Sequence, residues 1–371
     1  MRIPLLDLKA QYASIKSEID QAVHRVLDSC RFILGPEGEA LEEEMAVFCQ
    51  TRHAVGVANG TDALVLALHA LDIGSGDEVI TTPYTFFATA EAVARVGAVP
   101  VFVDIDPVTM NMDVNQVKTK ISGRTKAVIP VHIFGQMVDV EGLTDLIGDE
   151  DIKIIEDAAQ AVGARYRGRS AGSLGHAGTL SFFPTKNLGA YGDGGMVLTN
   201  DAQTAEALRR LRFHGCKKKY YHDTLGYNSR LDEMQAAILR VKLRYIERWN
   251  EARRAKAARY DKLLAEAARK GDVVLPGRDD LAQPVYHLYV LRSSRRGDIM
   301  RALNEAGIGT AVYYPVPVHL QRAFRQLGLG PGSLPVSEQA AEQALAIPCY
   351  PELTDDRQEI IVKIINEVLA S

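Results

Sequence analysis

The fold is decided by residues 55–95, which read VGVANGTDALVLALHALDIGSGDEVITTPYTFFATAEAVAR. Two short apolar runs, residues 55–58 and 78–81, are each followed by a segment with helical patterning, residues 61–71 and 86–95. The apolar runs lack the polar alternation of a half-exposed strand, so we expect both of their faces to be covered. Such strands alternating with helices are typical of a largely parallel sheet, and they predict the α/β class.

The same alternation continues on both sides of this stretch. Upstream we expect a helical arm at residues 12–28, and downstream strands at 99–103, 127–132 and 152–156 with a helix at 114–121. A helix-rich stretch from residue 234 to about 269 precedes a smaller set of elements: strands at 287–291 and 310–314, and helices at 297–305, 336–345 and 355–369. The pattern predicts a large domain with helices on both faces of a mostly parallel sheet, residues 1–245, and a connecting helix with a small C-terminal α/β domain, residues 246–371.

The composition of the 371-residue chain is that of an ordinary globular protein, with 47% hydrophobic and 24% charged residues. This content supports at least one sizeable core and excludes a disordered chain. The net charge of −4 gives no global attraction to nucleic acid or to an anionic membrane. We find neither a signal peptide nor a run of about 18 apolar residues, and we therefore expect a cytoplasmic protein.

The four cysteines stand singly along the chain, at Cys30, Cys49, Cys216 and Cys349, with no CxxC pair. This spacing indicates neither a metal site nor a disulfide framework, and it favours a reducing compartment.

A lysine with unusual surroundings follows another apolar run, in SFFPTKNLGAYGDGG at residues 181–195. Lys186 lies between Pro184, which bars a continuing helix, and a glycine-rich turn that lets backbone approach a ligand closely. One interpretation is a solvated lysine on a surface loop. The other is a Schiff-base lysine, whose amine is neutral often enough to attack a carbonyl because its surroundings have a low dielectric constant.

An acidic residue ends a buried strand in IIEDAAQAVGA, residues 154–164. Asp157 stands where ligands bind in open α/β sheets. It is either an ordinary N-cap of a helix at Ala158 or the acid that keeps the pyridine nitrogen of pyridoxal phosphate protonated. Lys186 and Asp157 together point to chemistry of the second kind.

A third segment, ANGTDAL at residues 58–64, forms a turn between a strand and a helix. Gly60 permits close approach and the Thr61 hydroxyl adds a donor, so the start of this helix can hold a phosphate. A plain capped helix start is the alternative, because Thr and Asp are common there for structural reasons.

Five motifs occur in one order along the chain: GTDAL at 60–64, PYTF at 83–86, EDAAQ at 156–160, SFFPTK at 181–186 and GYNSRLD at 226–232. Together they resemble the DegT-type nucleotide-sugar aminotransferases, a branch of the aspartate aminotransferase fold, fold type I. The resemblance runs from Leu6 to Pro317. It implies a pyridoxal phosphate enzyme that takes an amino group from L-glutamate.

The resemblance assigns roles to the residues around the cofactor ring. Lys186 matches the lysine that forms the Schiff base and then moves the proton, and Asp157 matches the partner of the pyridine nitrogen. Gln160 matches the side chain that binds the phenolic oxygen. Phe86 matches the ring that stacks on the pyridine face, although core packing would explain a Phe there equally well.

The cofactor phosphate is assigned a second group of residues. Gly60, Thr61 and Ser181 match phosphate ligands of the same subunit. Asn228 matches a ligand that the family supplies from the neighbouring subunit, which implies a homodimer with shared active sites. An ordinary turn residue is the alternative for Asn228.

The resemblance also bears on the reaction and the substrate. A dehydratase branch carries His where this chain has Lys186, so transamination is favoured. The segments 191–195, 228–232 and 310–315 look most like those of enzymes that aminate C3 of a 3-keto hexose or hexuronate linked to UDP or dTDP, in making surface polysaccharide or a secondary metabolite. Arg230 could clamp a sugar carboxylate, and Tyr313, Tyr314 and His319 are further candidates for lining the sugar site.

Three alternatives stay open. One is amination of a 4-keto nucleotide sugar. Another is a different lysine-dependent reaction on the same fold, such as decarboxylation, retro-aldol cleavage or transamination of an amino acid, although the resemblance at residues 226–232 argues against it. The third is a regulator that binds pyridoxal phosphate without turnover, although such a protein would have no need to retain Lys186, Asp157 and Gln160 together.

Overall fold

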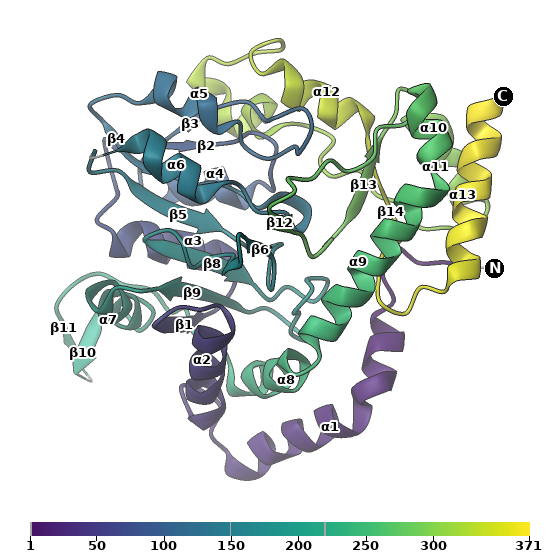
Figure 1. Ribbon diagram of the computed structural model, residues 1–371. Coiled ribbons are helices and arrows are strands. Elements are labelled where there is room, and N and C mark those ends of the chain that lie inside the picture. The colour runs from purple at the N-terminus through teal and green to yellow at the C-terminus, as the bar shows by residue number, and fades with distance from the viewer. Residues whose placement is uncertain (1, 149, 219) are drawn as a thin grey trace.

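The computed structural model describes residues 2–148, 150–218 and 220–371. Its centre is a seven-stranded sheet in the order β1-β9-β8-β5-β4-β2-β3 (Figure 1). The strands are β1 (His53–Val57), β2 (Glu78–Thr81), β3 (Val99–Phe102), β4 (Thr125–Val128), β5 (Lys153–Asp157), β8 (Ala177–Ser181) and β9 (Gly195–Thr199). β9 runs antiparallel to both of its neighbours, and the other pairs are parallel. The expected α/β class with a mostly parallel sheet is confirmed.

Helices cover both faces of this sheet, as the lack of polar alternation predicts. On one face lie α3 (Gly60–Ala70), α4 (Ala88–Arg95) and α7 (Ala202–Leu211). On the other lie α1 (Leu8–Ser29), α2 (Pro36–Phe48), α5 (Val114–Val117), α6 (Val140–Ile147) and α8 (Glu233–Leu243). The side chains of successive strand residues lie on opposite faces of the sheet: Ile154 packs with α6 and Ile155 packs with α3. Strand positions on both faces of the sheet are therefore apolar.

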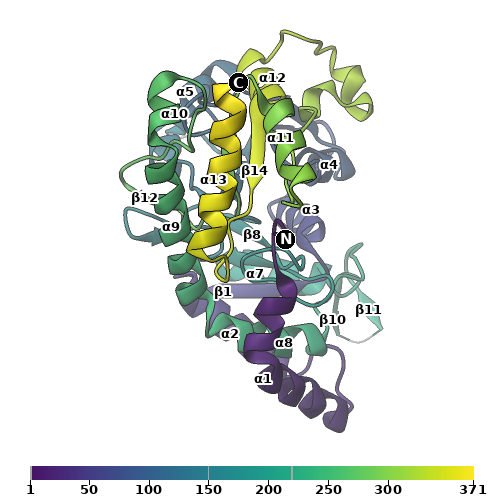
Figure 2. The ribbon, with the colours of Figure 1, turned by 90° about the vertical axis from the view of Figure 1, so that its right-hand side faces the viewer.

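The C-terminal elements form a hydrophobic cluster of their own. They are α9 (Ile246–Leu263), α10 (Ala265–Lys270), β13 (Tyr289–Arg292), α11 (Arg296–Glu305), β14 (Ala344–Ile347) and α13 (Asp355–Ala370), with α12 (Pro335–Gln343) beside them. α13 lies between α9 and α11 (Figure 2). The chain start joins this group, because Ile3 is 1% exposed and bridges to Ile308. The division between residues 245 and 246 stays a prediction; α8 ends at Leu243 and α9 begins at Ile246.

Short elements complete the fold. They are β6 (Arg165–Tyr166), β7 (Arg169–Ser170), β10 (Cys216–Lys218), β11 (Tyr221–His222), β12 (Ala282–Gln283) and the 3-10 turns Lys118–Lys120, Ile133–Gly135, Val318–Leu320 and Arg322–Leu327. Within the described residues, no helix combines the length and the apolar character that crossing a bilayer requires.

Two expectations about the C-terminal part are wrong. No strand forms at residues 310–314, where only Ala311 makes an isolated bridge, to Ala346. The carbonyl of Tyr313 instead accepts a hydrogen bond from the buried Tyr84 hydroxyl (2.6 Å), which draws this segment toward the main sheet. The helix expected to reach residue 345 ends at Gln343, because the next four residues pair with β13.

Candidate active site

Several of the predicted site residues lie where strands of the main sheet end. Asp157 is the last residue of β5, and Ser181 is the last residue of β8. Ser181 pairs with Gly195 of β9, and Gly195 also pairs with Val57 at the end of β1. The turn that follows β1 therefore lies beside the end of β8. In open α/β sheets this edge is where ligands bind.

The turn after β1 presents the start of α3 toward Ser181. The Asn59 side chain caps the helix by accepting from the Asp62 amide at 2.8 Å. The first amides of a helix have no acceptor within the helix and can bind an anion. A Cβ atom at Gly60 would lie 2.7 Å from that of Ser181, so glycine is needed for this approach. Thr61 and Ser181 are both half-buried at this point.

Lys186 lies in the turn that follows β8. Its amide donates to the Phe183 carbonyl at 2.8 Å, and its side chain is half-buried. Burial lowers the pKa of Lys186 to about 8, and the nearby charge of Asp157 opposes that shift. The amine is therefore neutral far more often at neutral pH than that of a surface lysine. A fully solvated lysine, the first interpretation of the sequence, does not fit this position.

Asp157 is 6% exposed and is held by two donors. The Thr89 hydroxyl donates to Oδ2 at 2.8 Å, and the Ala159 amide donates to Oδ1 at 3.2 Å. The Thr85 and Thr89 hydroxyl oxygens lie 3.0 Å apart; because the Thr89 proton is used on Asp157, Thr85 is the donor. No α-helix begins directly after Asp157, where residues 158–164 form turns, so the alternative role of helix N-cap is wrong.

Gln160 lies on the turn after β5 with a defined amide orientation. Its Oε1 accepts from the Phe134 amide at 2.7 Å, and its Nε2 donates to the Tyr314 hydroxyl at 3.0 Å. The second Nε2 proton remains available for a ligand oxygen. Tyr314 thus links the irregular C-terminal segment to the edge of the sheet.

Phe86 is 58% exposed, so core packing does not explain it. Its ring centroid lies 6.2 Å from that of Tyr314, with the planes inclined by 41°. The buried ring of Tyr84 meets Tyr314 edge-on at 6.4 Å. Tyr313 and Tyr314 are both half-buried. An aromatic wall therefore borders the space beside Lys186 and Asp157, with one ring open for stacking.

Asn228 and Arg230 lie on a segment that packs against the start of α3. The Ser229 hydroxyl between them donates to Asp62 at 2.7 Å. Asn228 is exposed, and its predicted role toward a neighbouring subunit stays a prediction. Arg230 is half-buried, with its guanidinium 5.5 Å from the Phe213 ring centroid.

His319 is placed differently from the other predicted substrate residues. It is 1% exposed, and its Nε2 lies 3.1 Å from Oε1 of Glu338. The ring packs near Phe102, at 6.5 Å between centroids. In this conformation His319 is a core residue, and contact with a sugar finds no support.

The sequence analysis missed the residues that hold the site residues in place. Thr85 and Thr89 are the clearest case: Thr85 lies within the PYTF motif and Thr89 four residues later, and this spacing is the signal that could have revealed them. Asn187 is another: its Nδ2 donates to Asn250 (2.8 Å), and His287 Nδ1 donates to its Oδ1 (3.1 Å). Burial, together with the charges of Lys186 and Arg253, holds the pKa of His287 well below its usual value, so the imidazole is neutral.

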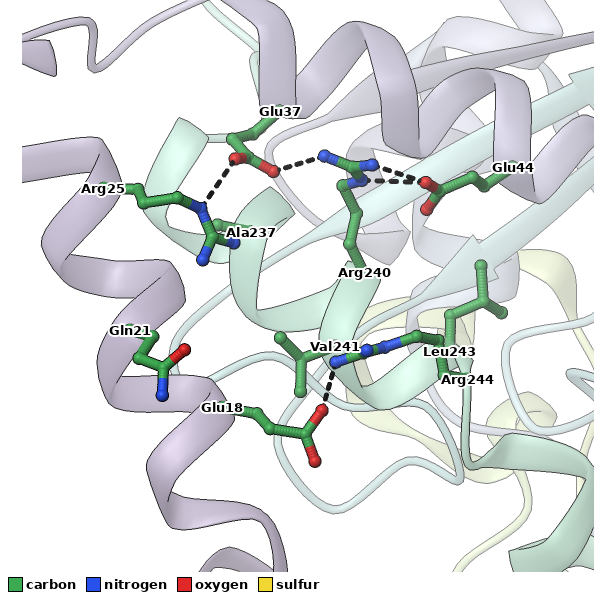
Figure 3. A pocket seen from close by; sticks show the side chains of 10 residues that line it. All are labelled: Glu18, Gln21, Arg25, Glu37, Glu44, Ala237, Arg240, Val241, Leu243 and Arg244. Carbon is green, nitrogen blue, oxygen red and sulfur yellow. Dashed lines mark hydrogen bonds and ion pairs between the residues drawn. The ribbon is translucent and has the colours of Figure 1, made fainter.

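A separate cavity of about 460 Å³ lies between α1, α2 and α8 (Figure 3). Its charged side chains pair with one another: Arg240 bonds both Glu37 and Glu44 at 2.6 Å, and Arg244 bonds Glu18. These internal pairs leave little unmatched charge for a ligand, and none of the predicted site residues lines the cavity.

Comparisons with known proteins agree with the family resemblance of the sequence motifs. The sequence model of the DegT/DnrJ/EryC1/StrS aminotransferase family matches residues 13–366. A Geobacillus stearothermophilus protein named "Pleiotropic regulatory protein" is 52% identical over 99% of this chain and 98% of its own length. The "UDP-N-acetyl-3-dehydro-alpha-D-glucosamine 3-aminotranferase" of Acidithiobacillus ferrooxidans is 45% identical over 99% of this chain and 98% of its own. Other relatives are named as transaminases of dTDP-linked 3-amino sugars.

A solved structure is similar over the whole chain. The crystal structure of S. venezuelae DesV in complex with a ketimine intermediate has a TM-score of 0.97 and 45% sequence identity. The match covers 100% of this chain and 99% of that chain.

Proposed function

Because this chain belongs to the DegT/DnrJ/EryC1/StrS aminotransferase family, and is therefore an aminotransferase, we propose that it aminates C3 of a 3-keto nucleotide sugar. The sugar is a hexose or hexuronate linked to UDP or dTDP, and L-glutamate is the amino donor. The names of relatives that carry out 3-amino transfer support the position of the keto group.

The residues at the strand ends fit pyridoxal phosphate, whose chemistry the family and its solved structures imply. Gly60 lets the start of α3 approach Ser181, which suits a phosphate. Asp157 offers a buried carboxylate to a protonated ring nitrogen. Lys186 offers an amine whose pKa of about 8 leaves part of it neutral at pH 7. All three features are present in the described chain.

When bound, pyridoxal phosphate supplies an electron-withdrawing ring and a carbon that exchanges amines. In our proposal, Asp157 holds a proton on the ring nitrogen, and Thr89 keeps its carboxylate oriented. Gln160 donates through Nε2 to the phenolic oxygen, while Phe86 excludes water from one face of the ring. Lys186 accepts at Nζ the proton that leaves Cα of the amino donor and later returns one to the sugar carbon. General acid–base work of this kind contributes about 10²- to 10⁴-fold.

The observation that carries the proposal is the placement of Lys186 near Asp157, close enough for the Asp157 charge to act on the pKa of the amine. An amine with a lowered pKa beside a buried carboxylate, at the carboxyl edge of the sheet, is what amino transfer needs. Arg230 supports a hexuronate, because a half-buried guanidinium can bind a carboxylate bidentately. We also propose a cytoplasmic homodimer in which Asn228 completes the partner's phosphate site; the exposure of Asn228 leaves it free for that contact.

The test is a screen of keto nucleotide sugars with glutamate, read by mass spectrometry. We expect an amino sugar and 2-oxoglutarate from a UDP- or dTDP-linked 3-keto sugar, with Lys186→Ala as the inactive control. Product from 4-keto sugars alone would show that the enzyme aminates C4 rather than C3. Cofactor binding with no turnover on any acceptor would favour a regulator, a role that the name of the G. stearothermophilus relative suggests for that protein.

A further inference from the structure

Lys242 is a fully buried lysine that the proposed reaction does not use. It belongs to α8 and is 0% exposed. Its Nζ donates to the carbonyl of Gly189 and lies 4.9 Å from the ring centroid of Tyr191. Burial alone lowers its pKa to about 8, with no acidic group among the causes. A lysine in such a place needs an explanation, because burying an amine costs free energy that an apolar side chain of similar length would not.

The group that Lys242 binds is the base of the loop that carries Lys186. The Ala190 amide donates to the Phe182 carbonyl at 2.8 Å, which closes residues 182–190 into a loop. Gly189 lies at the foot of that loop. A Cβ atom on Gly189 would come within 2.4 Å of the Pro184 carbonyl oxygen, so the two sides of the loop are in tight contact. A displacement of Gly189 would therefore also displace the turn that carries Lys186.

A second side chain of the same helix holds the neighbouring main chain. Gln235 is two turns before Lys242 on α8, and its Oε1 accepts from the Tyr191 amide at 2.8 Å. The Tyr191 ring also meets Tyr12 of α1 edge-on, at 5.9 Å. Side chains of α8 therefore form hydrogen bonds with the main chain at two residues just after Lys186, Gly189 and Tyr191. The bond to Gly189 comes from a buried cation.

We propose that Lys242 is a positioning residue: by donating to Gly189 and covering the Tyr191 ring, it holds the loop so that the amine of Lys186 stays shielded from water beside Asp157. An apolar residue would fill the same space but would leave the Gly189 carbonyl without its donor. The cation also gains from the aromatic face, which an apolar residue does not. The inference rests on the proposed role of Lys186.

The test compares Lys242→Met with the wild type in the apoprotein. One readout is amide hydrogen exchange of the peptide covering residues 183–191. The other is the pH dependence of acetylation of Lys186 by limiting acetic anhydride. We expect at least about tenfold faster exchange, because the Gly189 hydrogen bond no longer limits opening. We also expect the midpoint of Lys186 acetylation to rise from near 8 toward that of a solvated lysine.

The matched control is Lys256→Met, which removes a lysine of α9 that pairs with Asp355 at 2.7 Å. It should leave both readouts unchanged. Wild-type exchange and a wild-type midpoint in Lys242→Met would overturn the inference, even if thermal stability fell. Lys242→Gln keeps a donor on a shorter side chain and should give intermediate values; if the Met variant does not fold, wild-type values in Lys242→Gln overturn the inference.

A failure of the proposed function would be distinguishable from a failure of this inference. Borohydride reduction of the wild type with pyridoxal phosphate should leave the cofactor on Lys186. Attachment to another lysine would refute the role of Lys186 in the reaction, whereas the exchange and acetylation data would still report whether Lys242 holds the loop.

Discussion

Asp157→Asn is expected to make Lys186 more reactive as an amine while it makes the enzyme slower. The substitution removes one negative charge and keeps the size of the side chain. Asp157 raises the pKa of Lys186, against the larger lowering effect of burial. Without that charge the pKa of Lys186 falls further below about 8.

The size of the effect follows from the fraction of neutral amine at pH 7. With a pKa of about 8, about one Lys186 amine in ten is neutral. An ordinary lysine would have about one in three thousand. In Asp157→Asn the neutral fraction rises above one in ten, and the gain in acylation rate at pH 7 cannot exceed about tenfold, because the fraction saturates at one.

Turnover should change in the opposite direction. A neutral amide cannot hold the proton on the pyridine nitrogen, so the ring withdraws electrons less well. We expect the rate of amino transfer to fall by at least about 10²-fold, the lower end of what such proton placement contributes.

Two assays on the same preparation separate these effects. Competitive acetylation of the apoprotein between pH 6 and 11 gives the midpoint for Lys186, and 2-oxoglutarate release gives turnover. A midpoint that rises in Asp157→Asn would show that the carboxylate does not act on Lys186 through its charge. Near-normal turnover would show that Asp157 is not the partner of the ring nitrogen.

Three further outcomes are expected. Gly60→Ala should weaken pyridoxal phosphate binding by at least about tenfold in a fluorescence titration, since the new methyl would lie 2.7 Å from the nearest side-chain carbon of β8. Thr89→Val removes the hydroxyl that donates to Asp157 and should lower kcat by about tenfold with little change in KM, because one hydrogen bond to a charged group is lost. Mixing Lys186→Ala with Asn228→Ala subunits should restore part of the activity, since one site of each heterodimer would contain neither defect.

Each of these has its own control. Gly297→Ala, at a glycine with no atom within 4 Å of an added Cβ, should bind the cofactor normally. Thr89→Ser keeps the hydroxyl and should retain most of kcat; an equal loss in both Thr89 variants would point to packing instead. In the mixing experiment, verified heterodimers with no gain in activity would place Asn228 in its own subunit's site or in none.

The local sequence was enough to predict most strands of the main sheet, though not β9, and the turns in which the candidate site residues lie. Apolar runs without polar alternation identify doubly covered strands, and Gly, Pro and Asp at their ends mark the turns that bear Gly60, Asp157 and Lys186. These signals lie within a few residues of one another. They therefore depend on backbone geometry and turn chemistry that neighbouring residues decide.

Only the tertiary structure decided what surrounds those residues. Thr89 reaches Asp157 across 68 residues of chain, and Lys242 reaches Gly189 across 53. Tyr84 binds the Tyr313 carbonyl across 229 residues, in a segment whose local pattern predicts a strand. Which polar groups are buried, and which partners form hydrogen bonds with them, depends on the elements that pack together. The pattern of residues along one segment carries no information about that packing.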